Sequence, residues 1–501
     1  MDLFKQLQVL RRSGGEIETP GLDDARLKPF LTADPLLADA VTAAHEAYQE
    51  LAADDPEIAA LGEREQIARV QHDYLNFYPE DAVNPYVALA ARGPWIVTSK
   101  GAVLYDAGGY GMLGLGHAPP AVLAALSKPY AMANVMTPHL SQMRFAAALR
   151  REIGRQRSGG CPYARFVCVN SGSEAVSVAA RIADINARIQ TDPDGPARGH
   201  PIRRLGLRGG FHGRTDRPAR YSDSSHKVYA RYLASFRDRD DLLTVEPNST
   251  TQLQQIFDFC RHNRIFIEAL FIEPVMGEGN PGAGITPEFY ALARQLTQEH
   301  GTLLLVDSIQ AGLRAHGVLS ITDYPGFEAL PPPDMETYSK ALNAGQFPLS
   351  VLALTERAAA LYRKGVYGNT MTTNPRALEV AVAVLDSLTP ELRANIRERG
   401  AELVQRFEAL RGELGAAIVR VQGTGLLFSL ELDSRVYKSY GRNSIEEYLR
   451  QHGLNVIHGG ENSLRFTPHF AINDAEVELL VAATREALCH GPRLALAEAA
   501  A

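Results

Sequence analysis

The sequence predicts an α/β protein with a mostly parallel central sheet between helices. From about residue 150 to 355, short apolar runs alternate with longer helical or loop stretches. The runs RFVCVN, FIEALFIEP and GTLLLVDS are continuously apolar rather than alternating, which is typical of strands buried on both faces. The stretch SGSEAVSVAARIADINARI, which follows RFVCVN, places its apolar residues near helical spacing. Strand and helix repeated in this order indicate layers packed around one sheet.

Changes in composition predict four parts along the chain. Residues 1–85 are rich in Ala, Leu, Glu and Asp and are expected to form a mostly helical N-terminal segment. Residues 86–150 are expected to begin a small domain and lead into the large one. Residues 151–385 form the expected large domain, and residues 386–501 the expected smaller α+β domain, where strand-like runs return.

Length, charge and cysteine content limit the function. The chain has 501 residues, 45% of them apolar, and a net charge of -7 without a Lys/Arg block, so a nucleic-acid partner is not expected. No apolar run approaches the roughly 20 residues that span a bilayer, and the N-terminus lacks a signal-peptide pattern, which predicts a cytosolic protein without a membrane partner. The four cysteines are scattered without metal-ligand spacing, so we expect reduced thiols and no metal site.

A glycine-rich motif suggests a competing function. The letters GYGMLG, residues 109–114, fit the dinucleotide-binding pattern GxGxxG and follow a strand-like run. However, nothing from Ser127 to Arg151 is acidic, although a nucleotide site needs a carboxylate about 20 residues after the motif. Two prolines also stand where the phosphate-binding helix should begin. We therefore favour a turn with glycines for backbone reasons over a nicotinamide or flavin site.

A second junction suits an anion better. In VNSGSEA a buried strand ends and a helix begins at Ser171, Gly172 and Ser173. The free N–H groups of a first helical turn attract anions, and small residues let a phosphate approach. Taken alone, ordinary N-capping by serine explains the same letters. In GGFHGRT, further along, Phe211 suits stacking on a flat ring and Arg214 suits binding a carboxylate, although a turn with a core aromatic is the simpler alternative.

Two charged residues follow apolar runs. Asp307 ends the run TLLLV, so its carboxylate is expected at the carboxyl edge of a buried strand, where open α/β sheets bind ligands. It is either half of a structural ion pair or the partner of a protonated ligand nitrogen. Lys340 follows in ETYSKALNAG, and a lysine in a desolvated pocket becomes a nucleophile toward aldehydes. Phosphate cradle, stacking ring, acid and lysine together are what pyridoxal phosphate (PLP) requires.

The order of the motifs resembles a known family. NSGSEA, FHGRT, IEPVMGEG, LLVDSIQAG, YSKAL and NTMTTNP are similar, in order and interval, to the class III, ornithine-type, aminotransferases of PLP fold type I. The resemblance covers roughly residues 85–490. It implies a large domain with a mostly parallel sheet and a smaller α+β domain, with PLP as the cofactor.

The resemblance also implies cofactor contacts. They fall on Ser171, Gly172, Ser173, Phe211, His212, Asp307, Gln310, Lys340 and Thr370. Lys340 would form the internal aldimine and then shuttle a proton between the substrate and the cofactor. Asp307 would keep the pyridine nitrogen protonated, so that the ring accepts electrons. Gln310 would reach the ring hydroxyl.

Substrate contacts and assembly are implied in the same way. Thr370 matches a residue that reaches the phosphate of the neighbouring subunit, which implies a homodimer with shared active sites. Arg465 matches the residue that binds the α-carboxylate of glutamate or 2-oxoglutarate. Arg214 would contact the substrate, and Glu278 matches an acid that pairs with that arginine. For Arg214 and Glu278, surface charges near a cleft explain the sequence equally well.

The predicted function is transfer of an amino group, from an ω-amino donor or other primary amine, to a keto acid such as 2-oxoglutarate. The sequence departs from the family at Ser308, where an acid or alanine is usual, and this bears on the substrate. An aminomutase, racemase, lyase or decarboxylase of the same fold is the first alternative. The dinucleotide oxidoreductase and a catalytically silent scaffold are the others.

Overall fold

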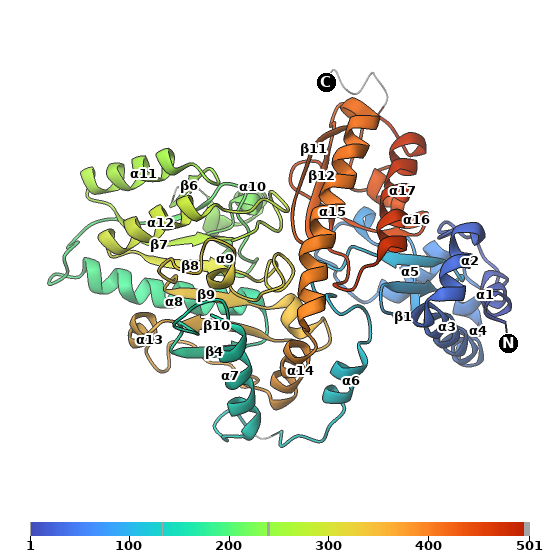
Figure 1. The fold of residues 1–501 in the computed structure, drawn as a ribbon, viewed down its shortest axis with the longest axis horizontal. Coiled ribbons are helices and arrows are strands. Elements are labelled where there is room, and N and C mark those ends of the chain that lie inside the picture. Colours follow the sequence, from blue (N-terminus) through green and yellow to red (C-terminus); the bar gives the residue numbers. More distant parts are fainter. Residues whose placement is uncertain (1, 133, 238–240, 495–501) are drawn as a thin grey trace. The chain divides into compact units, whose positions relative to one another are not determined.

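The computed structural model describes residues 2–132, 134–237 and 241–494 (Figure 1). The chain forms two compact units. The first comprises residues 1–119, 398–422 and 428–501, and the second comprises residues 120–397 and 423–427. Among the described helices, none combines the length and apolar content needed to cross a membrane.

The second unit is built on a seven-stranded sheet in the order β4-β10-β9-β8-β7-β5-β6. Its strands are β4 (Arg165–Val169), β5 (Ile202–Leu207), β6 (Leu242–Val245), β7 (Phe266–Ile272), β8 (Leu303–Asp307), β9 (Met335–Tyr338) and β10 (Ser350–Leu354). Strands β5 to β9 run parallel, whereas β10 is antiparallel to both of its neighbours, β4 and β9. The predicted mostly parallel α/β sheet is therefore confirmed.

Helices cover both faces of this sheet because its central strands are apolar on both sides. On β8, Leu303 and Leu305 pack in a core with α8 (Gly172–Thr191) and α13 (Glu356–Leu361). Leu304 and Val306 pack in a second core with α11 (Thr250–His262) and α12 (Pro287–His300). Successive side chains of a strand point to opposite faces, so one run of apolar residues serves both cores. Figure 1 shows α8 on one side of the sheet and α11 and α12 on the other.

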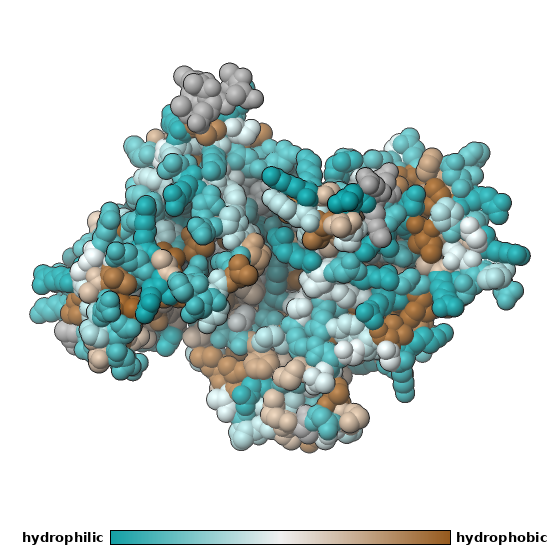
Figure 2. Space-filling view, turned by 180° about the vertical axis from the view of Figure 1, so that it is seen from behind, coloured by the Kyte–Doolittle hydropathy of each residue, from teal (hydrophilic) through white to brown (hydrophobic). Residues whose placement is uncertain are grey.

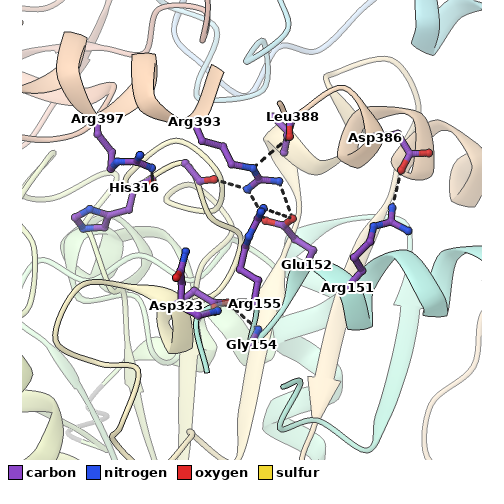
Figure 3. Close-up of polar contacts among 12 residues, drawn as sticks. Arg151, Glu152, Gly154, Arg155, His316, Asp323, Asp386, Leu388, Arg393 and Arg397 are labelled. Atoms are coloured by element: carbon purple, nitrogen blue, oxygen red, sulfur yellow. Dashed lines mark hydrogen bonds and ion pairs between the residues drawn. The ribbon is translucent and has the colours of Figure 1, made fainter. Parts of the chain in front are cut away.

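A buried ion pair joins two helices of this unit. Glu152 ends α7 (Leu140–Glu152), and Arg393 lies in the first turn of α15 (Pro390–Leu414), whose residues up to Arg397 belong to the second unit. The two terminal nitrogens of Arg393 donate to the two Glu152 carboxylate oxygens, both at 2.8 Å, and Nε donates to the Leu388 carbonyl (Figure 3). The remaining helices of the unit are α6 (Pro120–Leu126), α9 (Asp216–Ala219), α10 (His226–Tyr232) and α14 (Pro375–Asp386).

The first unit begins with five helices. They are α1 (Leu3–Arg11), α2 (Asp24–Ala33), α3 (Pro35–Asp54), α4 (Pro56–Ala60) and α5 (Glu63–Gln71). Helix α3 packs on a sheet in the order β1-β2-β3-β13, and α1, α2 and α4 pack against α3. The strands are β1 (Ala88–Arg92), β2 (Trp95–Thr98), β3 (Val103–Asp106) and β13 (Leu454–Asn455). The buried Trp95 indole N–H donates to Asp34 (2.6 Å), and Lys100 Nζ donates to the carbonyls of Gly14 and Ala59. The N-terminal helices are thus fixed to the sheet by buried polar contacts.

The C-terminal part of this unit holds a second four-stranded sheet, in the order β11-β12-β15-β14. Its elements are β11 (Ile418–Thr424), β12 (Leu427–Leu432), α16 (Ile445–Gln451), β14 (Ile457–Gly459), β15 (Ser463–Phe466) and α17 (Asp474–His490).

The segment 109–114 does not have the geometry of a dinucleotide site. Strand β3 pairs antiparallel with β2, and the next helix, α6, begins only at Pro120, so no strand–turn–helix unit surrounds the glycines. The glycines serve the backbone: Gly111 has a φ of +84°, and a Cβ at Gly114 would lie 2.3 Å from the Phe470 ring. The oxidoreductase alternative loses its structural basis.

Candidate active site

The carboxyl edge of the large sheet gathers segments that are far apart in sequence. Strands β4, β5, β7, β8 and β9 all point the same way, so the residues that follow them meet at one edge. A cavity of about 210 Å³ lies there, within the second unit. Its lining consists of Ser171, Gly172, Ser173, Phe211, His212, Gly213, Glu273, Asp307, Ile309, Gln310, Ser339 and Lys340. Eight of the predicted site residues are therefore brought together.

Asp307 is held by three donors. Its Oδ2 lies 2.8 Å from Nδ1 of the buried His212. Its Oδ1 accepts hydrogen bonds from the backbone N–H of Ile309 and from Thr337 Oγ1, both at 3.2 Å. Thr337 faces Asp307 across the parallel β8–β9 pair. A buried carboxylate with these donors is oriented for a cationic group in the cavity, and so both alternatives for Asp307, structural partner and ligand partner, are compatible with its position.

Lys340 opens a short 3-10 turn immediately after β9, at Lys340–Asn343. Its φ is +46°, in the left-handed region that a residue with a Cβ adopts only at a cost. Such strained positions cluster at functional sites, where the surrounding structure holds them. Strands β8 and β9 are neighbours, and Asp307 and Lys340 line the same cavity from their ends.

Close contacts around glycine shape the proposed phosphate site. Ser171 caps α8, with its hydroxyl accepting the N–H of Glu174. A Cβ at Gly172 would lie 2.7 Å from Ile309 Cδ1, and one at Gly213, where φ is +117°, would lie 2.2 Å from Ser173 Oγ. The Gly213 backbone therefore lies directly against Ser173. Ser171, Gly172 and Ser173 thus bring the N-terminus of α8 and a serine hydroxyl to the cavity, which is the composition of an anion site.

Glu273 is a cavity residue that sequence reasoning left unassigned. It follows β7, and its carboxylate accepts the backbone N–H of Phe211 and of Gly277, each at 2.9 Å. Burial raises the pKa of Glu273 from 4.5 to about 7; the His212 ring opposes this rise and the Asp307 charge adds to it. The signal was present in the sequence, because Glu273 ends an apolar run just as Asp307 does.

Gln310 fits against a second glycine of the same motif. A Cβ at Gly277 would lie 1.8 Å from Gln310 Oε1, so only glycine leaves room for this side chain. Gln310 is buried and lines the cavity together with Phe211. The motif IEPVMGEG thus supports the cavity through Glu273 and Gly277.

Four predicted residues do not line this cavity. Arg214 is exposed, and its guanidinium carbon lies 5.3 Å from the centre of the Phe211 ring. Glu278 is half-buried in the loop after β7. Thr370 lies in a separate surface depression with Met132, Val135 and Met371. Arg465 belongs to the first unit, where it is buried with its guanidinium carbon 5.3 Å from the Tyr110 ring centre.

The donor set fits PLP. The cavity offers an acid, a lysine, a partly buried aromatic ring and an anion site at a helix N-terminus, matched to a phosphorylated pyridine aldehyde. The glycine contacts at 172 and 213 keep space that larger residues would fill. Fold and site together define a PLP-dependent enzyme of fold type I.

The chain belongs to the class III aminotransferases, whose family profile matches residues 77–488. An acetylornithine aminotransferase of Mesorhizobium japonicum is 27% identical over 402 residues, covering 77% of this chain and 89% of the relative. An ornithine aminotransferase of Staphylococcus aureus is 28% identical over 420 residues, covering 81% and 93%.

Solved structures share the fold. An ornithine aminotransferase of Toxoplasma gondii superposes with a TM-score of 0.71 at 24% identity, covering 88% of this chain and 97% of that one. An amine transaminase from an uncultivated Pseudomonas species, in its PLP-bound form, gives a TM-score of 0.69 at 23% identity, covering 84% and 99%. The N-terminal 76 residues lie outside the family profile.

Proposed function

We propose that this enzyme takes the ω-amino group of a diamino acid, or the amino group of another primary amine, and transfers it to a keto acid such as 2-oxoglutarate. The observation that carries the proposal is that Asp307 and Lys340 line one cavity beside the N-terminus of α8. The printed names of the relatives, acetylornithine and ornithine aminotransferases, support a diamino-acid donor.

The chain's residues divide the task of holding the cofactor. The N-terminus of α8 with Ser171, Gly172 and Ser173 would hold the phosphate. Asp307 would hold the ring nitrogen, oriented by His212. Phe211 would cover the ring, Gln310 would contact its hydroxyl, and Lys340 would bind the aldehyde carbon. When bound, PLP supplies an electron-accepting ring that stabilises negative charge on the substrate carbon.

Lys340 is the residue that moves protons in this proposal. With PLP bound, the Lys340 amine would remove the proton from the substrate carbon that carries the amino group. The same amine would act in the reverse direction when the keto acid receives its amino group, in the second half-reaction of a ping-pong order. The turn after β9 places Lys340 in the lining of the cavity.

Arg465 is the proposed carboxylate-binding residue. Its guanidinium offers a fork of N–H groups that matches a carboxylate, and Tyr110 covers it within 5.3 Å. This arrangement favours transamination with a dicarboxylate partner over the other outcomes of PLP chemistry. Contacts of Arg214 with substrate, and pairing of Glu278 with the arginine, stay predictions.

We also propose a homodimer in which Thr370 serves the neighbouring active site. Three exposed apolar residues line the same depression as Thr370: Met132, Val135 and Met371. Met136, Leu140 and Met143, in the segment that leads into and begins α7, are exposed as well. Hydrophobic surface gathers at the bottom of Figure 2, where α6 and α7 lie in Figure 1. Exposed apolar surface of this kind is typical of an interface, and a second copy is the occupant that would bring Thr370 to a cofactor.

Two experiments test these proposals. Purified holoenzyme is incubated with ornithine, acetylornithine and simple diamines, each with 2-oxoglutarate, and glutamate is measured. Release of carbon dioxide or racemised donor without glutamate would favour the lyase, decarboxylase or racemase alternatives. For the dimer, sedimentation should give twice the chain mass, and Met136→Glu with Met143→Glu should give the monomer mass. A cytosolic location stays a prediction, which cell fractionation tests.

A further inference from the structure

The loop that carries Thr370 is tied to the phosphate-binding helix by one carboxylate. Glu174 is the third residue of α8. Its Oε1 accepts hydrogen bonds from the Tyr367 hydroxyl and from Asn369 Nδ2, the latter at 2.6 Å. Its Oε2 accepts the backbone N–H of Asn170 at 2.8 Å. The same side chain therefore holds the end of β4 and the loop that begins near residue 366.

The loop is fixed on both sides of Thr370. While Asn369 Nδ2 donates to Glu174, Asn369 Oδ1 accepts the N–H of Met371 at 2.7 Å. Thr370 thus lies at the tip of a turn closed by the Asn369 side chain. Further along α8, Arg181 donates to the Val366 carbonyl and lies over the Tyr367 ring, 5.7 Å from its centre. The loop is held along α8, and Thr370 itself is exposed.

Helix capping explains only half of the Glu174 contacts. An acid at the third helical position commonly accepts an N–H just before the helix, and Oε2 does so here. Oε1 points to the loop instead. A negative charge in the first turn also repels a phosphate bound at that turn, so capping alone does not explain the presence of an acid at position 174. Burial would raise the Glu174 pKa, but the Tyr367, Asn369 and Asn170 donors outweigh it and lower the pKa, so the carboxylate stays ionised.

We propose that Glu174 is a positioning residue that presents Thr370 to the cofactor phosphate of the neighbouring subunit. Each phosphate-binding helix would then organise two sites, its own through its N-terminus and the neighbouring one through Glu174. The inference rests on the proposed function, in which Thr370 acts across the dimer.

Cofactor affinity is the first measurement. In Glu174→Gln, the amide either turns its NH₂ group toward the loop donors or keeps a neutral oxygen there and turns its NH₂ group toward the Asn170 N–H, so the anchor of the loop is lost or weakened. Loss of one hydrogen bond to a charged phosphate should raise the Kd for PLP about tenfold or more. Asp192→Asn, at the far end of α8, is the matched control and should leave the Kd unchanged. An unchanged Kd in Glu174→Gln overturns the inference.

Mixed dimers decide where Glu174 acts. Two differently tagged chains are co-expressed, one carrying Glu174→Gln and the other Lys340→Ala, and the hybrid is isolated through both tags. Only the Glu174→Gln chain keeps the lysine, so borohydride attaches the cofactor to that chain alone. If Glu174 acts across the dimer, its site receives an intact loop from the other chain. The Kd for PLP at the site of the Glu174→Gln chain should then return to the wild-type value.

A parallel hybrid separates the two proposals. A hybrid of one Thr370→Ala chain and one Lys340→Ala chain should show the wild-type Kd for PLP if Thr370 serves the neighbouring site. Recovery there without recovery in the Glu174→Gln hybrid would place Glu174 in its own site and overturn the inference alone. No recovery in either hybrid would overturn both the shared site and the inference. Should Glu174→Gln fail to fold, Tyr367→Phe with Asn369→Ala removes the hydroxyl and the amide that donate to Glu174 and takes its place.

Discussion

The Nδ1 atom of His212 lies 2.8 Å from Oδ2 of Asp307, at the carboxyl edge of the large sheet. His212 comes from the loop after β5 and Asp307 from the end of β8. Both side chains are buried, and both line the cavity. With its ring proton on Nδ1, His212 would donate to the carboxylate and so orient it within the cavity.

Asp307→Asn should therefore lower turnover by about a hundredfold or more while the protein still binds PLP, because the amide cannot keep a ring nitrogen protonated. Single-turnover rates with a reactive amine, and the Kd for PLP by absorbance, check this. Asp194→Asn, an exposed aspartate in the loop after α8, is the control. Turnover within a few-fold of wild type would rule out the role of Asp307.

Lys340→Ala should abolish the visible absorption of lysine-bound PLP and leave PLP bound without a covalent link. Turnover should fall about a hundredfold or more, since the proton-transferring amine is lost. Lys227→Ala, which removes an exposed lysine of α10, should behave as wild type. Normal turnover in the Lys340→Ala protein would show that another residue carries out this step.

Glu273 should make stability depend on pH. Its pKa is about 7 in the folded protein, mainly through burial, against 4.5 as the ordinary value. The folded state then binds the proton more tightly than the unfolded state, so stability falls as pH rises from about 4.5 to 7 and is level above that. The full effect is about 3 kcal/mol.

Glu273→Gln removes this titration. The unfolding free energies of wild type and variant are measured on cofactor-free protein at pH 5, 6, 7 and 8. Wild type should lose stability relative to the variant as pH rises, and the difference should stop changing near pH 7. A difference that is the same at all four values would refute the assignment.

The buried pair of Glu152 and Arg393 should matter far more than the exposed pair beside it. Their side chains are 6% and 7% exposed, so Glu152→Gln leaves a buried guanidinium without its counter-charge and should cost about 3–5 kcal/mol. Arg151 and Asp386, 63% and 58% exposed, form the matched control in the same region (Figure 3). Asp386→Asn should cost less than about 1 kcal/mol. Urea unfolding measures both, and equal costs would contradict the argument from burial.

Gly213→Ala should weaken PLP binding by displacing Ser173. The added Cβ would lie 2.2 Å from Ser173 Oγ, at a φ of +117°. Gly199→Ala separates strain from collision, because Gly199 has a φ of +70° with open space around it. Both variants should lose stability, but only Gly213→Ala should raise the Kd for PLP. A raised Kd in both would point to a general loss of structure.

Much of the large domain follows from local patterns. The runs ending at Val169 and Asp307 are apolar on both faces, and such continuous apolar runs predict buried strands of a layered sheet. Asp307 and Lys340 were identified because a charge directly after such a run must be at the sheet edge. Parallel strands end at the same edge of a sheet, so residues that follow different strands are expected to meet there. The cavity does bring Asp307 and Lys340 together.

Other features depend on contacts that no local pattern contains. The antiparallel direction of β10 is set by its partners, because its apolar run reads like those of the parallel strands. The anchoring of the loop at residues 367–369 by Glu174 spans almost 200 positions. The roles of the site residues and the four-part division of the chain stay predictions.

The pairing of β4 with β10 joins residues 165–169 to residues 350–354. During synthesis, β4, the strand that leads to α8, has no partner in the sheet until more than 180 further residues have left the ribosome. Closing so large a loop is slow, because its entropy is lost before the pairing is gained. A nascent chain that stops before β10 would therefore leave β4 without its partner in the sheet.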